Sequence, residues 1–422
     1  MTEQSTSTSG PAPGRGRGGV ASDAIVVLNA GSSSIKFAAF ACEAGSFALA
    51  GRLLHGEIDG TGPAARLVAK DAAGAELHAS GLDGTDDGPQ AHDRSLRLLF
   101  EWLERQLPGR RVLAVGHRVV HGGDRFVGPV RVDAVVLAQL DALSPLAPLH
   151  QPHNLAAIRV VERLHPQMPQ VASFDTAFHA TLPWVAQACA LPERVRNAGV
   201  RRYGFHGLSY EYIASVLPTS LGERADGRVV VAHLGNGASM CALRDRRSVE
   251  TTMGFTALDG LMMGTRCGNL DPGVVMYMQT TLGMSLAEVE HVLYQESGLL
   301  GISGISADMR SLEASPDPRA QAAIALFVHR ITQELGALAA VLGGLDALVF
   351  TAGIGEHSAE VRRRVCASAA WLGVSIDAQA NGPGAGRIDG PASKVAVHVI
   401  PTDEELMLAR HACDVMADRG RA

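Results

Sequence analysis

The sequence predicts an α/β protein with two related domains. Its 422 residues exceed the size of one ordinary domain. Apolar residues make up 46% of the chain and charged residues 19%, with 47 glycines, which is typical of a globular α/β protein. A strand–loop–strand pattern at residues 24–40 occurs again at residues 229–243, and the two loops begin 204 residues apart. One such echo can arise by chance, but it favours a duplicated architecture.

Charge and composition argue against several classes of protein. The net charge of −6 argues against nucleic acid or an anionic membrane as the main partner, because both reward a basic surface. No run of about 18 apolar residues predicts a membrane span. The six cysteines form no C-x-x-C pair, which favours reduced thiols in a cytoplasmic protein over disulfides or a zinc site. Residues 1–22 lack an apolar segment and are rich in Ser, Thr, Gly, Pro and Arg, so we expect a disordered tail and no signal peptide.

The first half begins with a hairpin. Residues 24–28 read as a buried strand that stops at a Gly/Ser loop and resumes at residues 35–40. The polar stretch 55–92 predicts edge strands and loops. A helix follows over residues 92–107, with apolar side chains on one face. Residues 112–120 then predict an inner strand that ends at His-Gly-Gly.

The second half repeats this order of elements. A strand at residues 229–232 leads into the Gly/Asn/Ser loop 233–239 and out through a second strand at 240–243. A long helical pattern over residues 319–342 precedes a third strand, 347–350, which ends in a Gly-containing turn. The chain therefore has three strands that each run into a glycine-rich turn.

These turns have the composition of phosphate-binding loops. Glycine lets backbone N–H groups approach phosphate oxygens, and an adjacent lysine supplies a point charge; Gly31, Ser32, Ser34 and Lys36 combine these features. The sequence has no G-x-x-x-x-G-K-[ST] and no G-x-G-x-x-G-x-V, so neither a P-loop nor a protein-kinase fold is supported. A single Gly-Ser hairpin is usually only a turn, but two hairpins and a third Gly-turn together indicate a nucleotide.

Four polar residues stand among glycines or apolar neighbours between these loops. They are Arg118, Asp175, His206 and Arg266. Taken singly, each would be read as a structural residue, since a histidine beside aromatic residues is usually part of the core and an arginine usually forms a surface ion pair. Their joint occurrence beside phosphate-type loops favours a catalytic site.

Together these segments closely resemble the acetokinase family, which comprises acetate kinases and their propionate and butyrate kinase relatives. The resemblance covers about residues 24–410 and is carried by the segments 29–36, 116–118, 174–179, 203–207, 233–239, 264–266, 353–356 and 401–406. It implies the fold of the acetate and sugar kinase, heat-shock chaperone and actin superfamily, which is ribonuclease H-like, with two duplicated domains around a nucleotide cleft and a homodimer. The expected domains are 23–179 plus 404–422 and 180–403.

The resemblance also implies roles for individual residues. Asp175, His206 and Arg266 match the catalytic residues, and Asn29 and Glu404 match the positions at Mg²⁺, with Mn²⁺ as an alternative. The acid would lie at Arg118, Val120 and His150. The expected nucleotide-binding residues are Ser32, Ser34, Lys36, His233, Leu234, Gly235, Asn236, Gly237, Asp308, Met309, Arg310, Gly353, Ile354, Gly355, Glu356 and His357.

The implied reaction is the reversible transfer of a phosphoryl group from ATP to acetate, in line, with ADP and acetyl phosphate as products. A carboxylate is already ionised at pH 7, so we expect Asp175 to orient groups and not to act as an obligate base. Propionate or butyrate is the alternative acid, and a non-catalytic nucleotide-binding protein of the actin or chaperone kind is the alternative class. The sequence differs from the residues common in the family at His357, Asn269 and residues 149–154. These differences affect only the detail of the binding pockets.

Overall fold

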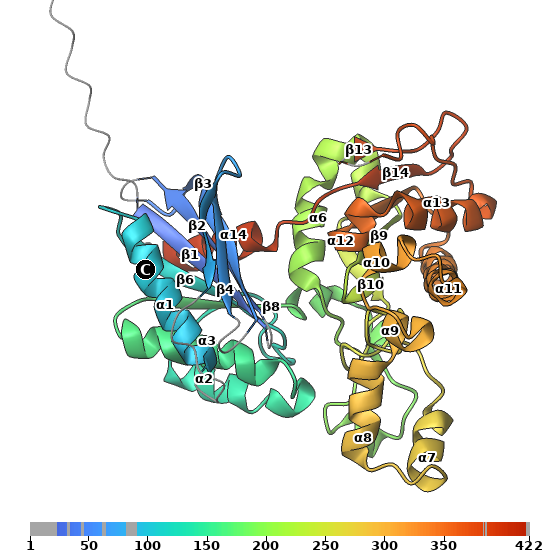
Figure 1. The fold of residues 1–422 in the computed structure, drawn as a ribbon, viewed down its shortest axis with the longest axis horizontal. Coiled ribbons are helices and arrows are strands. Elements are labelled where there is room, and N and C mark those ends of the chain that lie inside the picture. The colour runs from blue at the N-terminus through green and yellow to red at the C-terminus, as the bar shows by residue number, and fades with distance from the viewer. Residues whose placement is uncertain are drawn as a thin grey trace, which may run out of the picture.

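The computed structural model describes residues 23–31, 34–43, 46–60, 65–81, 91–382, 384 and 386–418. These residues form two mixed β-sheets, each flanked by helices, which confirms the predicted α/β class (Figure 1). The predicted tail 1–22 and the predicted nucleotide-binding residue Ser32 lie outside the described residues.

The first sheet has eight strands in the order β5-β4-β3-β2-β1-β6-β8-β7. Strands β1 and β2 form the antiparallel hairpin predicted from the Gly/Ser loop, while β6 runs parallel to β1, and β8 runs parallel to β6. The polar stretch predicted as edge strands supplies β4 and β5 at one edge. The strands are β1 (Asp23–Ala30), β2 (Ser34–Cys42), β3 (Leu49–Asp59), β4 (Arg66–Asp71), β5 (Glu76–Gly81), β6 (Val112–Val119), β7 (Val130–Arg131) and β8 (Gln170–Phe174).

The second sheet has six strands in the order β11-β10-β9-β12-β14-β13. Its centre repeats the first sheet, because β9 and β10 form an antiparallel hairpin and β12 and β14 follow as parallel neighbours. The strands are β9 (Val229–Leu234), β10 (Ala238–Arg244), β11 (Arg247–Thr251), β12 (Ala347–Thr351), β13 (Gly386–Arg387) and β14 (Ala396–Val399).

The repetition extends to the sheet edges. The order β3-β2-β1-β6-β8-β7 matches β11-β10-β9-β12-β14-β13 strand for strand, and the short strands β7 and β13 each pair antiparallel with the last parallel strand. The echo seen in the sequence is therefore a duplication of a whole sheet topology, with β4 and β5 added to the first copy.

Helices cover both faces of each sheet. The α-helices are α1 (Ala91–Gln106), α2 (Ala134–Asp141), α3 (Gln151–Leu164), α4 (Trp184–Gln187), α5 (Glu193–Arg196), α6 (Gly207–Leu221), α7 (Pro272–Thr280), α8 (Leu286–His291), α9 (Gly298–Ser303), α10 (Met309–Glu313), α11 (Pro318–Leu342), α12 (Ala352–His357), α13 (Ala359–Ser368) and α14 (Glu404–Asp418). Helices α1 and α3 pack on one face of the first sheet, and α11 and α13 pack on one face of the second.

The remaining face of each sheet is covered by a helix that follows the strands of the other sheet in the sequence. Helix α6 follows the last strand of the first sheet in the chain but packs on the second sheet, through Tyr210, Ile213 and Leu217. Helix α14 follows the last strand of the second sheet but packs on the first, through Met407 and Leu408 (Figure 1). The packing of α14 supports the proposed domain boundary at residue 404, which remains a prediction, as does the boundary at 179.

Helix α11 is, among the described residues, the one helix long and apolar enough to cross a membrane by length and composition. It is a core helix in this fold. Its residues Ile324, Phe327 and Ile331 are buried in the same cluster as Met240 and Phe350 of the second sheet.

Two local predictions need correction. The segment after β12, predicted as a Gly-turn, is the short helix α12, entered through Ala352 at a left-handed φ of 64°. The second loop is also shorter than predicted, because His233 and Leu234 belong to β9 and Ser239 to β10. Only residues 235–237 make the turn.

The buried imidazole of His117 on β6 makes stability depend on pH. It is 2% exposed, and burial lowers its pKa from 6.5 to about 4. Between pH 4 and pH 6.5 the His117 imidazole binds a proton in the unfolded chain but not in the folded chain. The free energy of unfolding therefore keeps its full contribution from His117 above pH 6.5 and decreases as the pH drops towards 4. His117 alone is expected to contribute about 1.4 kcal/mol per pH unit to the slope of the unfolding free energy, and the other buried histidines add their own contributions.

Urea unfolding of the wild type and of His117→Gln between pH 4.5 and 7.5 measures this slope. We expect the variant to lose about that much of the pH dependence, while His329→Gln, at an exposed position of α11, keeps it. Equal slopes for the wild type and His117→Gln would contradict the assignment.

Candidate active site

Arg118 lies at the end of β6 and connects three strands. Its Nε and Nη2 donate to the carboxylate of Asp175, at 2.9 Å to Oδ1 and 2.5 Å to Oδ2, and its Nη1 donates to Asn29 Oδ1 at 3.0 Å. The three residues stand at the ends of β1, β6 and β8, whose parallel alignment brings these ends together. Burial acts to lower the pKa of Arg118, but Asp175 outweighs it and raises the pKa.

His206 and His233 lie face to face beside this group. Their rings are stacked with centroids 4.3 Å apart. Desolvation by the surrounding protein lowers the pKa of both imidazoles, and nearby positive charges, including Arg118, lower it further; the pKa of His233 falls to about 3. Both rings are therefore neutral at pH 7.

The backbone of Asp175 fixes the position of His206. The N–H of Gly207 donates to the carbonyl oxygen of Asp175 at 2.8 Å, and a Cβ on Gly207 would lie only 2.1 Å from that oxygen. His206 itself has a left-handed φ of 58° immediately before α6. Such a conformation costs of order 1–3 kcal/mol and persists only where the surroundings enforce it.

Arg266 faces the same space from the loop between β11 and α7. Its Nη1 donates to the carbonyl oxygen of Ala257 at 2.9 Å, and among the described residues no carboxylate pairs with it. Desolvation lowers its pKa, and Arg118 adds to this effect. A partly buried guanidinium without a carboxylate partner is suited to bind an anion.

The glycine turn between β9 and β10 leaves room for that anion. A Cβ on Gly237 would lie 3.2 Å from His206 Nε2 and 3.8 Å from Arg266 Nη1. The imidazole and the guanidinium therefore meet at a backbone without a side chain, as phosphate oxygens require.

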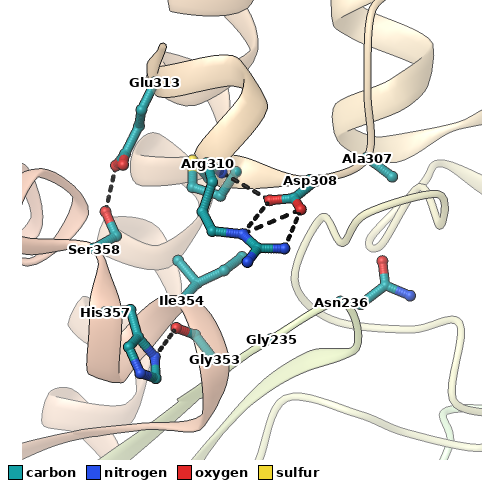
Figure 2. A pocket seen from close by; sticks show the side chains of 11 residues that line it. Gly235, Asn236, Ala307, Asp308, Arg310, Glu313, Gly353, Ile354, His357 and Ser358 are labelled. Carbon is teal, nitrogen blue, oxygen red and sulfur yellow. Dashed lines mark hydrogen bonds and ion pairs between the residues drawn. The ribbon is translucent and has the colours of Figure 1, made fainter. Parts of the chain in front are cut away.

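A pocket of about 560 Å³ opens next to this turn (Figure 2). It has the size of a small-molecule site. Of the predicted nucleotide-binding residues, Gly235, Asn236, Asp308, Met309, Arg310, Gly353, Ile354 and His357 line it, and Ala307, Glu313 and Ser358 complete it. His233, Leu234, Gly237, Gly355 and Glu356 are not part of its wall. Ala307, Glu313 and Ser358 were not predicted, because nothing in their local sequence pattern distinguishes them.

The side chains of this pocket hold one another in place. The guanidinium of Arg310 is paired with Asp308 (Nη2–Oδ2 2.6 Å), His357 Nδ1 lies 3.0 Å from the carbonyl oxygen of Gly353, and the hydroxyl of Ser358 donates to Glu313 (Figure 2). Lys36 and Ser34 lie on β2 outside this wall; Lys36 is exposed and sits directly opposite Asn29 in the hairpin.

A much smaller apolar pocket is lined in part by Ala257, whose carbonyl oxygen accepts the hydrogen bond from Arg266. Its free space is about 10 Å³, room for roughly one water-sized group. The predicted Val120 and His150 line it together with Leu146, Ala147, Pro148, Leu149, Phe205, Thr256, Ala257 and Tyr294. Desolvation lowers the pKa of His150 to about 4, and Arg266 and Arg118 add to this, so its imidazole is also neutral.

Glu404, at the start of α14, has the properties of a cation ligand. Burial raises its pKa to about 7, against the opposing effect of Arg118, and no donor among the described residues hydrogen bonds its carboxylate. Asn29, hydrogen bonded to Arg118, offers an amide oxygen in the same group. The described residues contain no group of three acidic, histidine or cysteine ligands. This set fits a cation such as Mg²⁺, which keeps waters and phosphate oxygens as most of its ligands.

Comparison with known proteins shows the family of this chain. The family model of the acetokinase family matches residues 24–410. The chain belongs to the acetokinase family. It is 58% identical over 405 residues to an acetate kinase from Rhodopseudomonas palustris, a match that covers 95% of this chain and 100% of the relative.

Solved structures of acetokinase family members share the fold. The acetate kinase of Porphyromonas gingivalis superposes with a TM-score of 0.82 at 35% identity, covering 93% of this chain and all of that one. A propionate kinase from Francisella tularensis superposes with a TM-score of 0.84 at 36% identity, covering 92% and 98%. The predicted duplicated fold of the acetate kinase superfamily is thereby confirmed.

One buried charge next to the pocket of about 560 Å³ was not predicted from the sequence. Arg362 on α13 is fully buried and donates to the carbonyl oxygens of Gly355 and Glu356, at 2.9 and 2.8 Å, and to Asn381 Oδ1 at 2.8 Å. A fourth bond runs to Gly382 O at 2.9 Å. Arg362 therefore satisfies the last carbonyl groups of α12, the helix that forms one wall of the pocket.

Replacing Arg362 with methionine removes this cap while keeping an apolar stem. We expect Arg362→Met to lose about 3 kcal/mol of stability, because two buried and two partly buried acceptors lose their donor, and to raise KM for the nucleotide. Thermal unfolding and steady-state kinetics measure both effects.

Arg363→Met is the matched control, because its guanidinium is exposed and paired with Glu360 on the same helix. It should stay within about 0.5 kcal/mol of the wild type. Similar losses in the two variants would contradict a special role for Arg362.

Proposed function

We propose that this chain is an acetate kinase, which transfers the γ-phosphoryl group of ATP to acetate and forms acetyl phosphate. Membership of the acetokinase family makes it a phosphotransferase with a carboxyl group as acceptor. The observation that carries the proposal is the meeting of Arg266 and His206 at Gly237, between a nucleotide-sized pocket and an apolar pocket of methyl size.

The residues have distinct tasks in this proposal. Arg118, held by Asp175, binds the carboxylate of the acid, whose methyl group enters the small pocket beside Val120. The acid is already ionised, so no base is required, and Asp175 acts by orienting Arg118. Arg266 and the neutral His206 stabilise charge on the transferring phosphoryl group, which is the main source of catalysis in such reactions.

We propose Mg²⁺ as the cofactor, held by Asn29 and Glu404, with Mn²⁺ as a substitute. When bound, the cation neutralises charge on the β and γ phosphates. Support comes from the desolvated Glu404 carboxylate, which lacks a donor among the described residues. Activity that survives removal of divalent cations by EDTA would count against this.

We further propose that the protein works as a cytoplasmic homodimer. Exposed apolar side chains on and around α7 and α8 support an interface there; they are Leu270, Val274, Met276, Tyr277, Leu282 and Leu286. Light scattering should give twice the 44.2 kDa of one chain. The six free cysteines fit a reducing compartment, which cell fractionation can test.

The rival class is a nucleotide-gated protein without an acid substrate. Such a protein has no need for Arg118 and Arg266 beside a closed apolar pocket. Release of ADP that depends on added acid excludes it, and ADP release that ignores the acid would favour it.

Replacing Arg266 tests the proposed chemistry directly. We expect Arg266→Ala to lower kcat by on the order of 10³-fold, because a charge-stabilising arginine contributes that much to phosphoryl transfer. The hydroxamate assay for acetyl phosphate provides the readout. Arg246→Ala, which removes an exposed ion pair with Asp226, is the control and should leave kcat unchanged. Near-wild-type turnover of Arg266→Ala would refute the assigned role.

The choice of acid is tested with a panel of acetate, propionate and butyrate. Because the free space is about 10 Å³, each added methylene should lower kcat/KM by about 10- to 200-fold, equivalent to about 1–3 kcal/mol. Val120→Ala should raise the propionate-to-acetate ratio. A wild type that prefers propionate would move the assignment to the alternative acid.

A further inference from the structure

A short chain of hydrogen bonds leads from the core of the second sheet to His206. The hydroxyls of Tyr210 on α6 and Ser239 on β10 lie 2.5 Å apart, and Ser239 Oγ lies 2.8 Å from His206 Nδ1. Tyr210 and Ser239 have no exposed surface. The arrangement links the imidazole to two hydroxyls that water does not reach.

The direction of this chain follows from the acceptors available to Tyr210. Among the residues that the structure describes, its hydroxyl hydrogen bonds only Ser239. Burial raises the pKa of Tyr210 well above 10, and Cys241 adds to this effect, so the phenol keeps its proton. The phenol must therefore donate to Ser239 Oγ, because the opposite direction leaves a buried O–H without an acceptor.

The direction of the first hydrogen bond determines that of the second, between Ser239 and His206. Its hydroxyl has one proton, and its other partner is His206 Nδ1. With Tyr210 donating to Ser239, the serine proton goes to Nδ1, which accepts it as a hydrogen bond. The neutral imidazole of His206 then carries its own proton on Nε2.

The protonated nitrogen faces the reaction space. A Cβ on Gly237 would lie 3.2 Å from Nε2 of His206, with Arg266 Nη1 on the same side. The stacked ring of His233 holds the plane of the imidazole. An N–H at this point attracts phosphoryl oxygens, whereas the lone pair of the other tautomer repels them.

We propose that Tyr210 and Ser239 are positioning residues that fix His206 as the Nε2–H tautomer, so that His206 donates a hydrogen bond to the transferring phosphoryl group. The inference rests on the proposed function, which gives this tautomer its task. The arrangement in which both hydrogen bonds run in the opposite direction is less populated by roughly one to two orders of magnitude, because it leaves a buried donor unpaired. A neutral histidine therefore behaves as a dedicated donor.

The variant Tyr210→Phe removes the group that sets the direction. Ser239 can then accept from His206 as well as donate to it, so we expect two tautomers of His206 in the ¹⁵N spectrum of histidine-labelled protein, where the wild type shows one. The His206 signals are assigned by their loss in His206→Asn. We expect kcat to fall roughly 3- to 30-fold, part of the 10²–10³-fold that loss of a whole donor costs. KM for acetate and ATP should change by less than about twofold, because binding contacts remain.

Tyr212→Phe is the matched control on the same helix, because its hydroxyl makes no hydrogen bond within the described residues. It should leave both the spectrum and kcat unchanged. If Tyr210→Phe does not fold, Ser239→Ala provides the second route, and it should also yield a mixture of tautomers.

Two results would overturn the proposal. One is a wild-type His206 protonated on Nδ1, and the other is an unchanged His206 signal in a folded Tyr210→Phe. Because the spectrum needs no turnover, a wild type without acetate kinase activity would refute the proposed function and leave the tautomer to be judged on its own.

Discussion

The ion pair between Arg118 and Asp175 is the interaction on which the rest of the site depends. Removing two charges from water costs several kcal/mol per ion unless the pair is fully hydrogen bonded. Here Asp175 receives donors from Nε and Nη2, and Asn29 accepts from Nη1. The pair ties together the ends of β1, β6 and β8. The backbone of Asp175 also anchors Gly207 and so places His206. One carboxylate residue thus positions a cation through its side chain and an imidazole through its carbonyl group.

The electrostatic character of the site follows from this pair. Asp175 compensates Arg118, while Arg266 stays without a carboxylate among the described residues. Desolvation lowers the pKa of His206 and His233, and positive charge nearby lowers it further, so both imidazoles are neutral. The site therefore holds an excess of positive charge next to the uncharged imidazoles, which can serve as hydrogen-bond donors. An anionic substrate supplies the missing negative charge, and neutral donors bind it without adding to the repulsion between the two arginines.

Much of this arrangement could be predicted from residues in sequence. Buried strands, helix α11 and the glycine turns have strong local patterns, and Arg118 and Asp175 follow strands whose ends must meet in a parallel sheet. Helix α12 was missed because two glycines in four residues favour a turn, while the cap that stabilises the helix comes from Arg362. Arg362 itself stands in a run of three arginines that reads as a solvated surface. Tyr210 looks like an ordinary core residue of α6, and only the three-dimensional contact with Ser239 distinguishes it.

The exchange of helices between the two sheets has a consequence for folding during synthesis. The first sheet is complete only when α14, at residues 404–418, packs against β1 and β6. Chains are made from the N-terminus at about 5–20 residues per second, so the first sheet is synthesised long before its final covering helix exists. Until then the apolar face formed by Ile25, Val27 and Phe40 is open. We expect the nascent N-terminal half to need shielding on the ribosome, and a chain that stops before α14 to leave the first sheet, not the second, exposed.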